Sequence, residues 1–266
     1  GGKVNKRQHY SVPTAADLER EERVLALLRE RFRAWQEKGY IPTMRIESGY
    51  NTDQPIREKG WTHWHHLFTP RQLLVLGLFG REAEKLTSGN IPIMTENLLE
   101  IGRLADTKGV GCRLLIWNPH PSKEGHANVF LNQALNTLYN YCHRTIKTIN
   151  PPEEKCRPIE GEFKISIVSA NMQSVKRSYW ITDPPYADAI NYHELSEFFL
   201  TWYEKPLQRL FPDWPADSRR ALAITGTGEE FRRNMVDVYA NLTGHMPDDG
   251  AQIVMFTHQD AGVWAD

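Results

Sequence analysis

Short apolar runs alternate with amphipathic stretches over residues 160–260, and this order restricts the fold more than any other feature of the chain. Runs typical of buried strands occupy 163–169, 179–182 and 252–257. Apolar residues recur at helical spacing between the last two runs, at Leu195, Phe198, Phe199 and Trp202 and then at Phe231, Met235, Val238 and Leu242. We expect Pro206 to end the first of these helices. Strands that alternate with helices favour an α/β fold with a largely parallel sheet.

A polar segment, Asp183-Pro184-Pro185-Tyr186, follows the run 179–182 directly. Open α/β sheets bind ligands at the carboxyl ends of their strands, where this segment would stand. The carboxylate of Asp183 can accept a hydrogen bond from an exocyclic amino group, and a proline-fixed backbone can aim a carbonyl at the second N–H. The ring of Tyr186 can stack on a base that has left its helix. The segment therefore predicts a site that holds an amine for methylation.

Asp-Pro-Pro-Tyr at 183–186 resembles motif IV of the amino-methyltransferases that use S-adenosylmethionine, above all the adenine-N6 DNA enzymes. Three longer stretches, 61–74, 183–202 and 248–264, resemble large bacterial DNA methylases with an N-terminal domain of unknown function. Some of those enzymes are associated with anti-phage defence. The resemblance extends from residue 10 to the C-terminus and is weaker in the middle.

The resemblance implies an α/β chain with a partial Rossmann-like class I methyltransferase fold and a helical N-terminal or insert region. It implies transfer of a methyl group from S-adenosylmethionine to adenine N6, with DNA and other defence-system proteins as partners. Cytosine-N4 methylation uses a similar motif and is an alternative. A catalytically idle nucleic-acid-binding module of a defence complex is another.

The same resemblance assigns roles to individual residues. Asp183, Pro184, Pro185 and Tyr186 would be the catalytic segment. Asn171 would join Asp183 in binding the cofactor, although an Asp is more usual at that place. Residues expected to face the substrate are Asp188, Asn191 and Tyr192. Asn191 has an alternative interpretation as a helix N-cap, with Glu194 completing a capping box.

The glycine-rich loop that binds the methionine end of the cofactor in class I methyltransferases is not found in this sequence. Gly109-Val110-Gly111 precedes a strand candidate, 112–117, rather than following one. Gly226-Thr227-Gly228 opens a helical pattern and is interpreted as its cap. We therefore expect the chain to be an internal part of a longer enzyme that carries this loop upstream.

The N-terminal part of the chain is predicted to be mostly helical. A helix is expected over 14–38, with Thr14 as N-cap, Asp17 as its partner and Gly39 at the end. Thr69 can cap a further helix whose first residue is Pro70. A helical face at 131–142 leads to a proline-rich loop at 151–158. This loop divides the chain into a helical region, 1–158, and the C-terminal half of a methyltransferase domain, 159–266.

Residues 40–68 have weak periodicity, which indicates irregular structure or a short hairpin. Within this segment His63, His65 and His66 stand close together, but their spacing matches no zinc pattern and no cysteine pair accompanies them. No metal site is expected.

The bulk composition is that of an ordinary soluble protein, with 40% hydrophobic and 24% charged residues and a net charge of −1. Phosphate contacts would have to come from local basic pairs: Lys176-Arg177, Arg219-Arg220 and Arg232-Arg233. No apolar run reaches the length of a membrane-spanning helix. The 3 cysteines are scattered, which fits a reducing cytoplasm rather than a disulfide framework.

Overall fold

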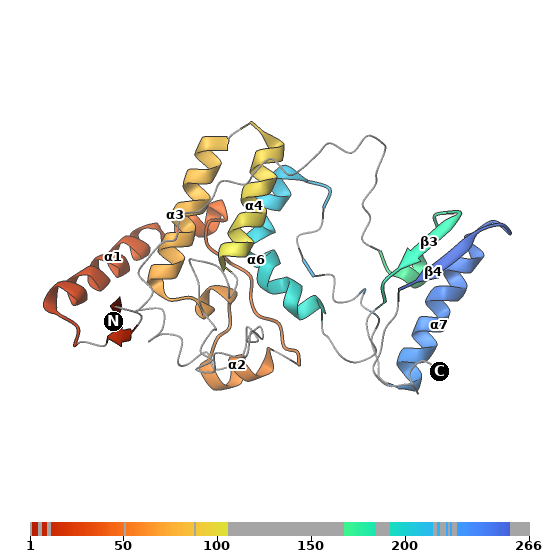
Figure 1. The fold of residues 1–266 in the computed structure, drawn as a ribbon, viewed down its shortest axis with the longest axis horizontal. Helices are drawn as coiled ribbons and strands as arrows, with labels where there is room; N and C mark the ends of the chain where they lie inside the picture. The colour runs from red at the N-terminus through yellow and green to blue at the C-terminus, as the bar shows by residue number, and fades with distance from the viewer. Residues whose placement is uncertain are drawn as a thin grey trace. The chain divides into compact units, whose positions relative to one another are not determined.

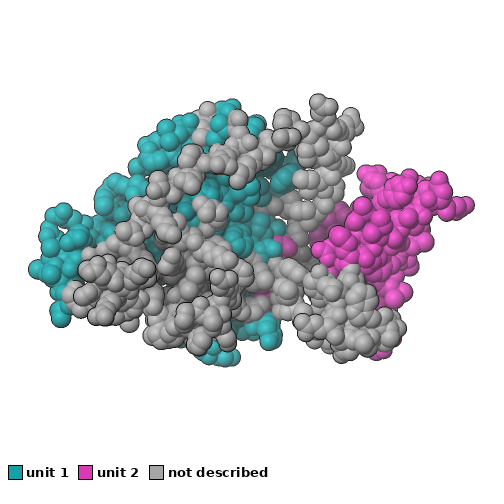
Figure 2. Space-filling view, viewed as in Figure 1, with its two compact units in different colours: residues 1–159, 196–217 teal, residues 160–195, 218–266 magenta. Residues whose placement is uncertain are grey.

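The computed structural model describes residues 2–4, 7–9, 12–50, 52–87, 89–105, 168–184, 192–214, 217–218, 222, 224 and 228–255. The chain divides into two compact units, shown in Figure 2. The helical unit comprises residues 1–159 and 196–217, and the sheet unit comprises 160–195 and 218–266. This division differs from the expected regions, 1–158 and 159–266, because residues 196–217 belong with the N-terminal part. The strand predicted at 112–117, the helix at 131–142 and the loop at 151–158 lie outside the described residues.

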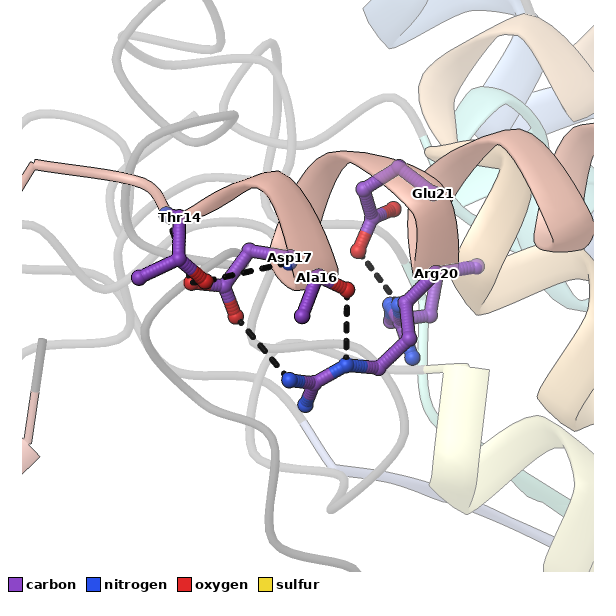
Figure 3. Close-up of polar contacts among 6 residues, drawn as sticks. Thr14, Ala16, Asp17, Arg20 and Glu21 are labelled. Carbon is purple, nitrogen blue, oxygen red and sulfur yellow. Dashed lines mark hydrogen bonds and ion pairs between the residues drawn. The ribbon is translucent and has the colours of Figure 1, made fainter.

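Helix α1 (Ala15–Lys38) begins and ends where the sequence predicts (Figure 1), and Figure 3 shows its start. At its start, the Thr14 backbone N–H donates to Asp17 Oδ2 at 3.0 Å, and the Asp17 N–H donates to Thr14 Oγ1 at 3.3 Å. This reciprocal pair is a capping box, which satisfies two donors that a helix start leaves without partners. At its end, Gly39 adopts φ 81°, a left-handed conformation that glycine takes without steric cost. An antiparallel strand pair, β1 (Gly2–Val4) and β2 (Arg7–His9), precedes the helix.

Helix α3 (Pro70–Thr87) begins at the proline where the sequence predicts it. Its cap is also reciprocal, since the Thr69 N–H donates to Gln72 Oε1 at 2.7 Å and the Gln72 N–H donates to Thr69 Oγ1 at 3.3 Å. Helix α4 (Ile91–Ala105) is not predicted from the sequence. Its start is nevertheless capped, because Asn90 Oδ1 accepts a hydrogen bond from the Ile93 N–H at 3.2 Å.

The segment 40–68 is irregular, as expected, but it also contains regular elements. An isolated antiparallel bridge joins Arg45 and His63. One expectation for this segment was a short hairpin, and of that hairpin only this bridge is present in the described residues. Helix α2 (Asp53–Lys59) and the 3-10 helix η1 (Trp64–Leu67) were not predicted. The η1 turn places Trp64 in the interior with no exposed surface.

Helix α6 (Tyr192–Leu210) supplies buried aromatic rings to the helical unit. The Phe198 ring stacks on Phe68 with centroids 6.0 Å apart and meets Trp64 edge-on at 6.1 Å. Trp202 contacts Phe68 edge-on at 5.1 Å. Such aromatic pairs add to the free energy gained by burying their area.

The prediction that Pro206 ends α6 is wrong, because the helix continues through it to Leu210. An interior proline removes one backbone hydrogen bond and normally kinks or ends a helix. Here side chains on both sides of the α6 proline are fixed. Before the proline, Phe198 and Trp202 are buried, and Lys205 donates to the Gln36 carbonyl at 2.6 Å. After the proline, Arg209 donates to the Lys38 carbonyl at 2.8 Å. Those carbonyls belong to the last turn of α1, where cations also complement the helix dipole.

Helices α1 and α3 approach closely at Gly77. A Cβ atom at this position would overlap the six-membered ring of Trp35, which is itself buried. At Gly80, one turn later, a Cβ atom would lie at ordinary contact distance, 3.5 Å from Tyr40 Cδ1. The two glycines of α3 therefore differ in their surroundings while sharing one helix.

We expect Gly77→Ala to lower the free energy of unfolding of the helical unit by about 1–3 kcal/mol, the usual cost of overpacking. Gly80→Ala is the matched control and should be neutral or stabilising by up to about 1 kcal/mol, because alanine favours helix. Urea unfolding followed by circular dichroism measures both. Equal effects of the two substitutions would contradict the close approach at Trp35.

The sheet unit contains the 3-10 helix η2 (Ala170–Met172), strand β3 (Tyr179–Thr182), helix α7 (Glu229–Gly244) and strand β4 (Ala251–Val254). The strands pair in parallel, with Tyr179 opposite Ala251 and Thr182 opposite Val254. Gly228 is the N-cap of α7, as the sequence predicts. Strand β4 was expected to reach residue 257, but it ends at Val254, and residues beyond 255 lie outside the described part.

Helix α7 covers one face of the strand pair (Figure 1). Gln252 Nε2 donates to the Tyr239 carbonyl at 3.1 Å and to Thr243 Oγ1 at 2.6 Å, which ties β4 to the helix. Asn241 Nδ2 donates to the carbonyls of Ala170 and Gln173, both at 3.0 Å, which ties η2 to the same helix. The described residues thus show a parallel strand pair with a covering helix, and the larger Rossmann-like sheet stays a prediction.

Candidate functional site

Asp183 and Pro184 lie directly after β3, at the carboxyl end of the strand. The Met255 N–H donates to the Thr182 carbonyl at 2.8 Å, so the last residues of β3 and β4 are held side by side at one edge. Asp183 is exposed at this edge and Pro184 is half-buried. This is the position that the sequence predicts for the segment. Pro185, Tyr186, Asp188 and Asn191 lie outside the described residues, so their predicted roles stay predictions.

Three side-chain polar atoms of the sheet unit are buried without a hydrogen-bond partner in the described part of the chain. They are Trp180 Nε1 and Thr182 Oγ1 on β3 and the Tyr239 hydroxyl on α7. Buried polar atoms nearly always have partners, so each such atom needs an explanation. Thr182 directly precedes Asp183, which makes its hydroxyl a candidate for positioning the backbone at the site. This residue was not predicted from the sequence, although a threonine that ends an apolar run is recognisable there.

Asn171, the predicted cofactor residue, lies in η2 with an exposed side chain, and Ser169 Oγ donates to its Oδ1. The strand predicted before it, 163–169, is only partly described, and Val168 and Ser169 are not in a strand. In the described part of the chain, no hydrogen bond or ion pair joins Asn171 to Asp183. The structure therefore does not bring these two residues together, and the cofactor role of Asn171 stays a prediction.

Tyr192, the predicted substrate residue, is the first residue of α6. Two residues later Glu194 is buried, with 2% of its surface exposed, and its carboxylate lies 3.9 Å from His193 Nε2. An acidic residue in the first turn complements the positive end of the helix dipole. The helix thus begins where the expected cap at Asn191 would place it.

The basic pairs differ in their surroundings. Arg232 forms an ion pair with Glu229 at 3.3 Å, which reduces its availability for phosphate. Lys176 and Arg177 are exposed, and the Arg177 guanidinium donates to the Lys176 carbonyl at 2.9 Å. This pair precedes β3, at the strand end opposite Asp183, because strands advance about 3.3 Å per residue. Arg219 and Arg220 lie outside the described residues.

Three histidine rings gather around η1 in the helical unit. The His65 and His66 centroids lie 4.4 Å apart, and His63 lies 5.3 and 5.4 Å from them. His66 Nδ1 accepts a hydrogen bond from the Thr62 N–H at 3.2 Å. Within the described ranges no group of His, Cys, Asp or Glu side chains has an arrangement that could hold a metal ion.

Burial and, to a smaller extent, the neighbouring His66 and His63 rings together lower the pKa of His65 from 6.5 to about 4. As the pH falls, His65 of the unfolded chain therefore takes up a proton near pH 6.5, whereas His65 of the folded helical unit takes one up only near pH 4. The stability that depends on neutral His65 is complete above pH 6.5 and is lost as the pH falls toward 4.

We expect His65→Gln to flatten the decline of unfolding free energy between pH 6.5 and 4, because glutamine does not titrate. Chemical denaturation at several pH values measures the two curves. Comparing the variant with the wild-type protein removes the common contribution of the carboxyl groups. A variant curve as steep as the wild-type curve would contradict this role of His65.

None of the described helices combines the length and the apolar character that are needed to cross a membrane. In comparisons with known proteins, no family model, no curated protein and no solved structure matched this chain.

Proposed function

We propose that this chain is part of an S-adenosylmethionine-dependent DNA methyltransferase that modifies adenine N6. The observation that carries the proposal is the position of Asp183-Pro184 at the carboxyl edge of a parallel strand pair. Ligands of open α/β sheets bind at this edge. The resemblance of 183–202 to the motif IV region of DNA methylases supplies the reaction.

The chemistry of the site is that of holding a weakly nucleophilic amine. The Asp183 carboxylate accepts a hydrogen bond from one N–H of the exocyclic amine, and the Pro184 carbonyl accepts the other. These bonds draw the nitrogen toward tetrahedral geometry and fix its direction of attack, and orientation of this kind contributes several kcal/mol, on the order of 7 or more in favourable cases. Tyr186 stacks on the base, which offsets the cost of removing it from the duplex.

S-adenosylmethionine, when bound, supplies the methyl group as a sulfonium. Among the residues of this chain, Asp183 and Asn171 are the ones proposed to face it. The sequence contains no Phe-x-Gly-x-Gly pattern, which usually holds the methionine end in class I methyltransferases. We therefore propose that another segment of the full-length protein provides that pattern, and that this chain by itself has little affinity for the cofactor.

The uncovered face of the strand pair supports the proposal of a larger sheet. Tyr179 and Ile181 of β3 are each 66% exposed, and Ile253 of β4 is 50% exposed. Parallel sheets occur almost only with both faces covered, and two strands by themselves are marginally stable. A face of this composition is expected of strands that belong to a wider, doubly covered sheet.

The test is the product that the full-length protein forms on DNA. The protein is incubated with duplex DNA and S-adenosylmethionine, and the DNA is digested to nucleosides for mass spectrometry. We expect N6-methyladenine. N4-methylcytosine would transfer the proposal to the cytosine enzymes, which share the amine chemistry. Absence of both products from a protein that binds the cofactor and DNA would favour the idle nucleic-acid-binding module.

A further inference from the structure

An apolar stripe on α1 is only partly covered by the rest of the helical unit. Leu18, Leu25 and Phe32 follow one another at intervals of seven residues, so they lie along one side of the helix. The Phe32 ring meets His65 edge-on, with the ring centroids 5.3 Å apart. Leu25 and Leu18, one and two steps earlier, are 37% and 57% exposed. The first half of α1 therefore presents apolar side chains that another helix can cover.

Two charged side chains beside this stripe differ from their neighbours on α1. Glu22 and Arg29 are exposed, and no ion pair joins either of them to another residue in the described part of the chain. The positions three and four residues away from each hold no opposite charge. Other acidic side chains of the same half of the helix have partners: Asp17 with Arg20 (Figure 3), Glu19 with Arg23 and Glu21 with Arg71 of α3. Glu22 and Arg29 are thus available for ion pairs with another molecule.

The order of these side chains along α1 is self-complementary. Glu22 stands four residues after Leu18 and Arg29 four residues after Leu25, the alternate spacing of four and three that forms the seam of a helix pair. An antiparallel pairing of two copies can place Glu22 opposite Arg29 of the partner subunit. Two-fold symmetry then repeats this ion pair, with Arg29 opposite the partner's Glu22. The same alignment brings the two Leu25 side chains together at the two-fold axis, because that axis passes halfway between positions 22 and 29.

We propose that the face of α1 formed by Leu18, Glu22, Leu25 and Arg29 is a dimerisation surface, which a second copy of this chain covers with its own α1. Charge complementarity selects this occupant, because the acidic and the basic side chain of the face pair with each other twice in the two-fold arrangement. An interface one helix wide is small, so the dimer is weak and forms as the protein concentration rises. The proposal does not depend on the proposed function.

DNA fits this face less well than a second copy does. Surfaces that bind the phosphate backbone gather basic side chains, whereas α1 carries as many acidic as basic ones. On the face itself, Glu22 would repel a phosphate that approached Arg29. The exposed Leu18 and Leu25 side chains would gain nothing from a phosphate backbone, but they are removed from water when two α1 helices pack together.

The test is sedimentation velocity of the full-length protein over a series of concentrations, with the wild type and two charge reversals. The wild type should change from monomer to dimer as the concentration rises. Glu22→Arg and Arg29→Glu should each weaken self-association roughly ten-fold or more, because each places like charges opposite one another at both symmetric contacts. An equal mixture of the two variants should regain the wild-type association, because every charged contact across the mixed pair then joins opposite charges.

Glu30→Arg is the matched control, since Glu30 is exposed and lies about 100° around the helix from Arg29, and it should leave association unchanged. Leu25→Ala keeps every charge and favours helix, and it should weaken association roughly five-fold through the lost apolar contact at the axis. A wild-type protein that stays monomeric at every concentration would overturn the proposal.

A dimer that both charge reversals leave intact would also overturn the proposal, and so would a mixture of the two variants that associates no better than either variant by itself. Binding of labelled duplex DNA is measured on the same samples. If Arg29→Glu lost DNA binding while its self-association stayed at the wild-type level, the face would belong to DNA and the dimer would be excluded.

Discussion

Asp183→Ala in the full-length protein is expected to lower the rate of methyl transfer about 100-fold or more, the scale seen when one fixed partner of a reacting group is removed. The carboxylate is proposed to hold the reacting amine and to face the cofactor, while affinity for DNA comes mainly from phosphate contacts elsewhere. DNA affinity should therefore change little. Because Asp183 is exposed at the end of β3, the unfolding free energy should also be unaffected.

Transfer of radiolabelled methyl groups to duplex DNA measures this effect, with binding measured in parallel. Asp237→Ala, which removes another exposed carboxylate of the sheet unit, is the control and should keep full activity. Full activity in Asp183→Ala would remove this residue from the mechanism. A loss of activity that simply follows a loss of DNA affinity would assign it to binding instead.

Trp64→Ala is expected to destabilise the helical unit by about 3–5 kcal/mol, the usual cost of removing a buried aromatic ring. Trp64 has no exposed surface, and its ring meets Phe198 of α6 edge-on at 6.1 Å. Tyr50→Ala is the control, since Tyr50 is 86% exposed and its loss should change stability by less than about 0.5 kcal/mol.

Thermal and urea unfolding of the two variants measure the difference. A loss within about 1 kcal/mol in Trp64→Ala would show that the aromatic cluster is not the core of this unit, since such a value is typical of peripheral positions. Combining Trp64→Ala with Phe198→Ala should cost less than the sum of the single losses, because the two rings contact each other.

The sequence predicted those parts of the fold that depend on local signals. The capping box at Thr14 and Asp17 and the cap at Thr69 fix the starts of α1 and α3 through neighbours in the chain. The apolar run 179–182 forms β3 within its predicted bounds. In each case the residues that determine the element lie inside it or directly beside it.

Parts of the fold that depend on distant contacts were not predictable in this way. The continuation of α6 through Pro206 is accompanied by rings and cations that pack against other segments. The contacts of Glu84 with Tyr40 and Arg209 join segments far apart in the sequence, and no local pattern predicts them. Helix α4, in contrast, could have been predicted from local sequence, because Asn90 is a typical N-cap residue and regularly spaced apolar residues follow it.

The candidate site was predicted in part. The place of Asp183 at a strand's carboxyl end follows from a short apolar run and the residues after it. The pairing of β3 with β4 agrees with the expected parallel sheet. The predicted environment of Asn171 depends on a strand that the described residues do not contain. The burial of the Thr182 hydroxyl depends on the elements that pack against β3, so the sequence of this strand alone does not predict it.

The most direct test of the central claim is the structure of the full-length protein with a methyl-free cofactor analogue and duplex DNA that contains its target base. We predict an adenine turned out of the duplex, with its N6 within about 2.7–3.2 Å of an Asp183 carboxylate oxygen and of the Pro184 carbonyl. An amine held by other residues, with Asp183 directed into solvent, would contradict the account.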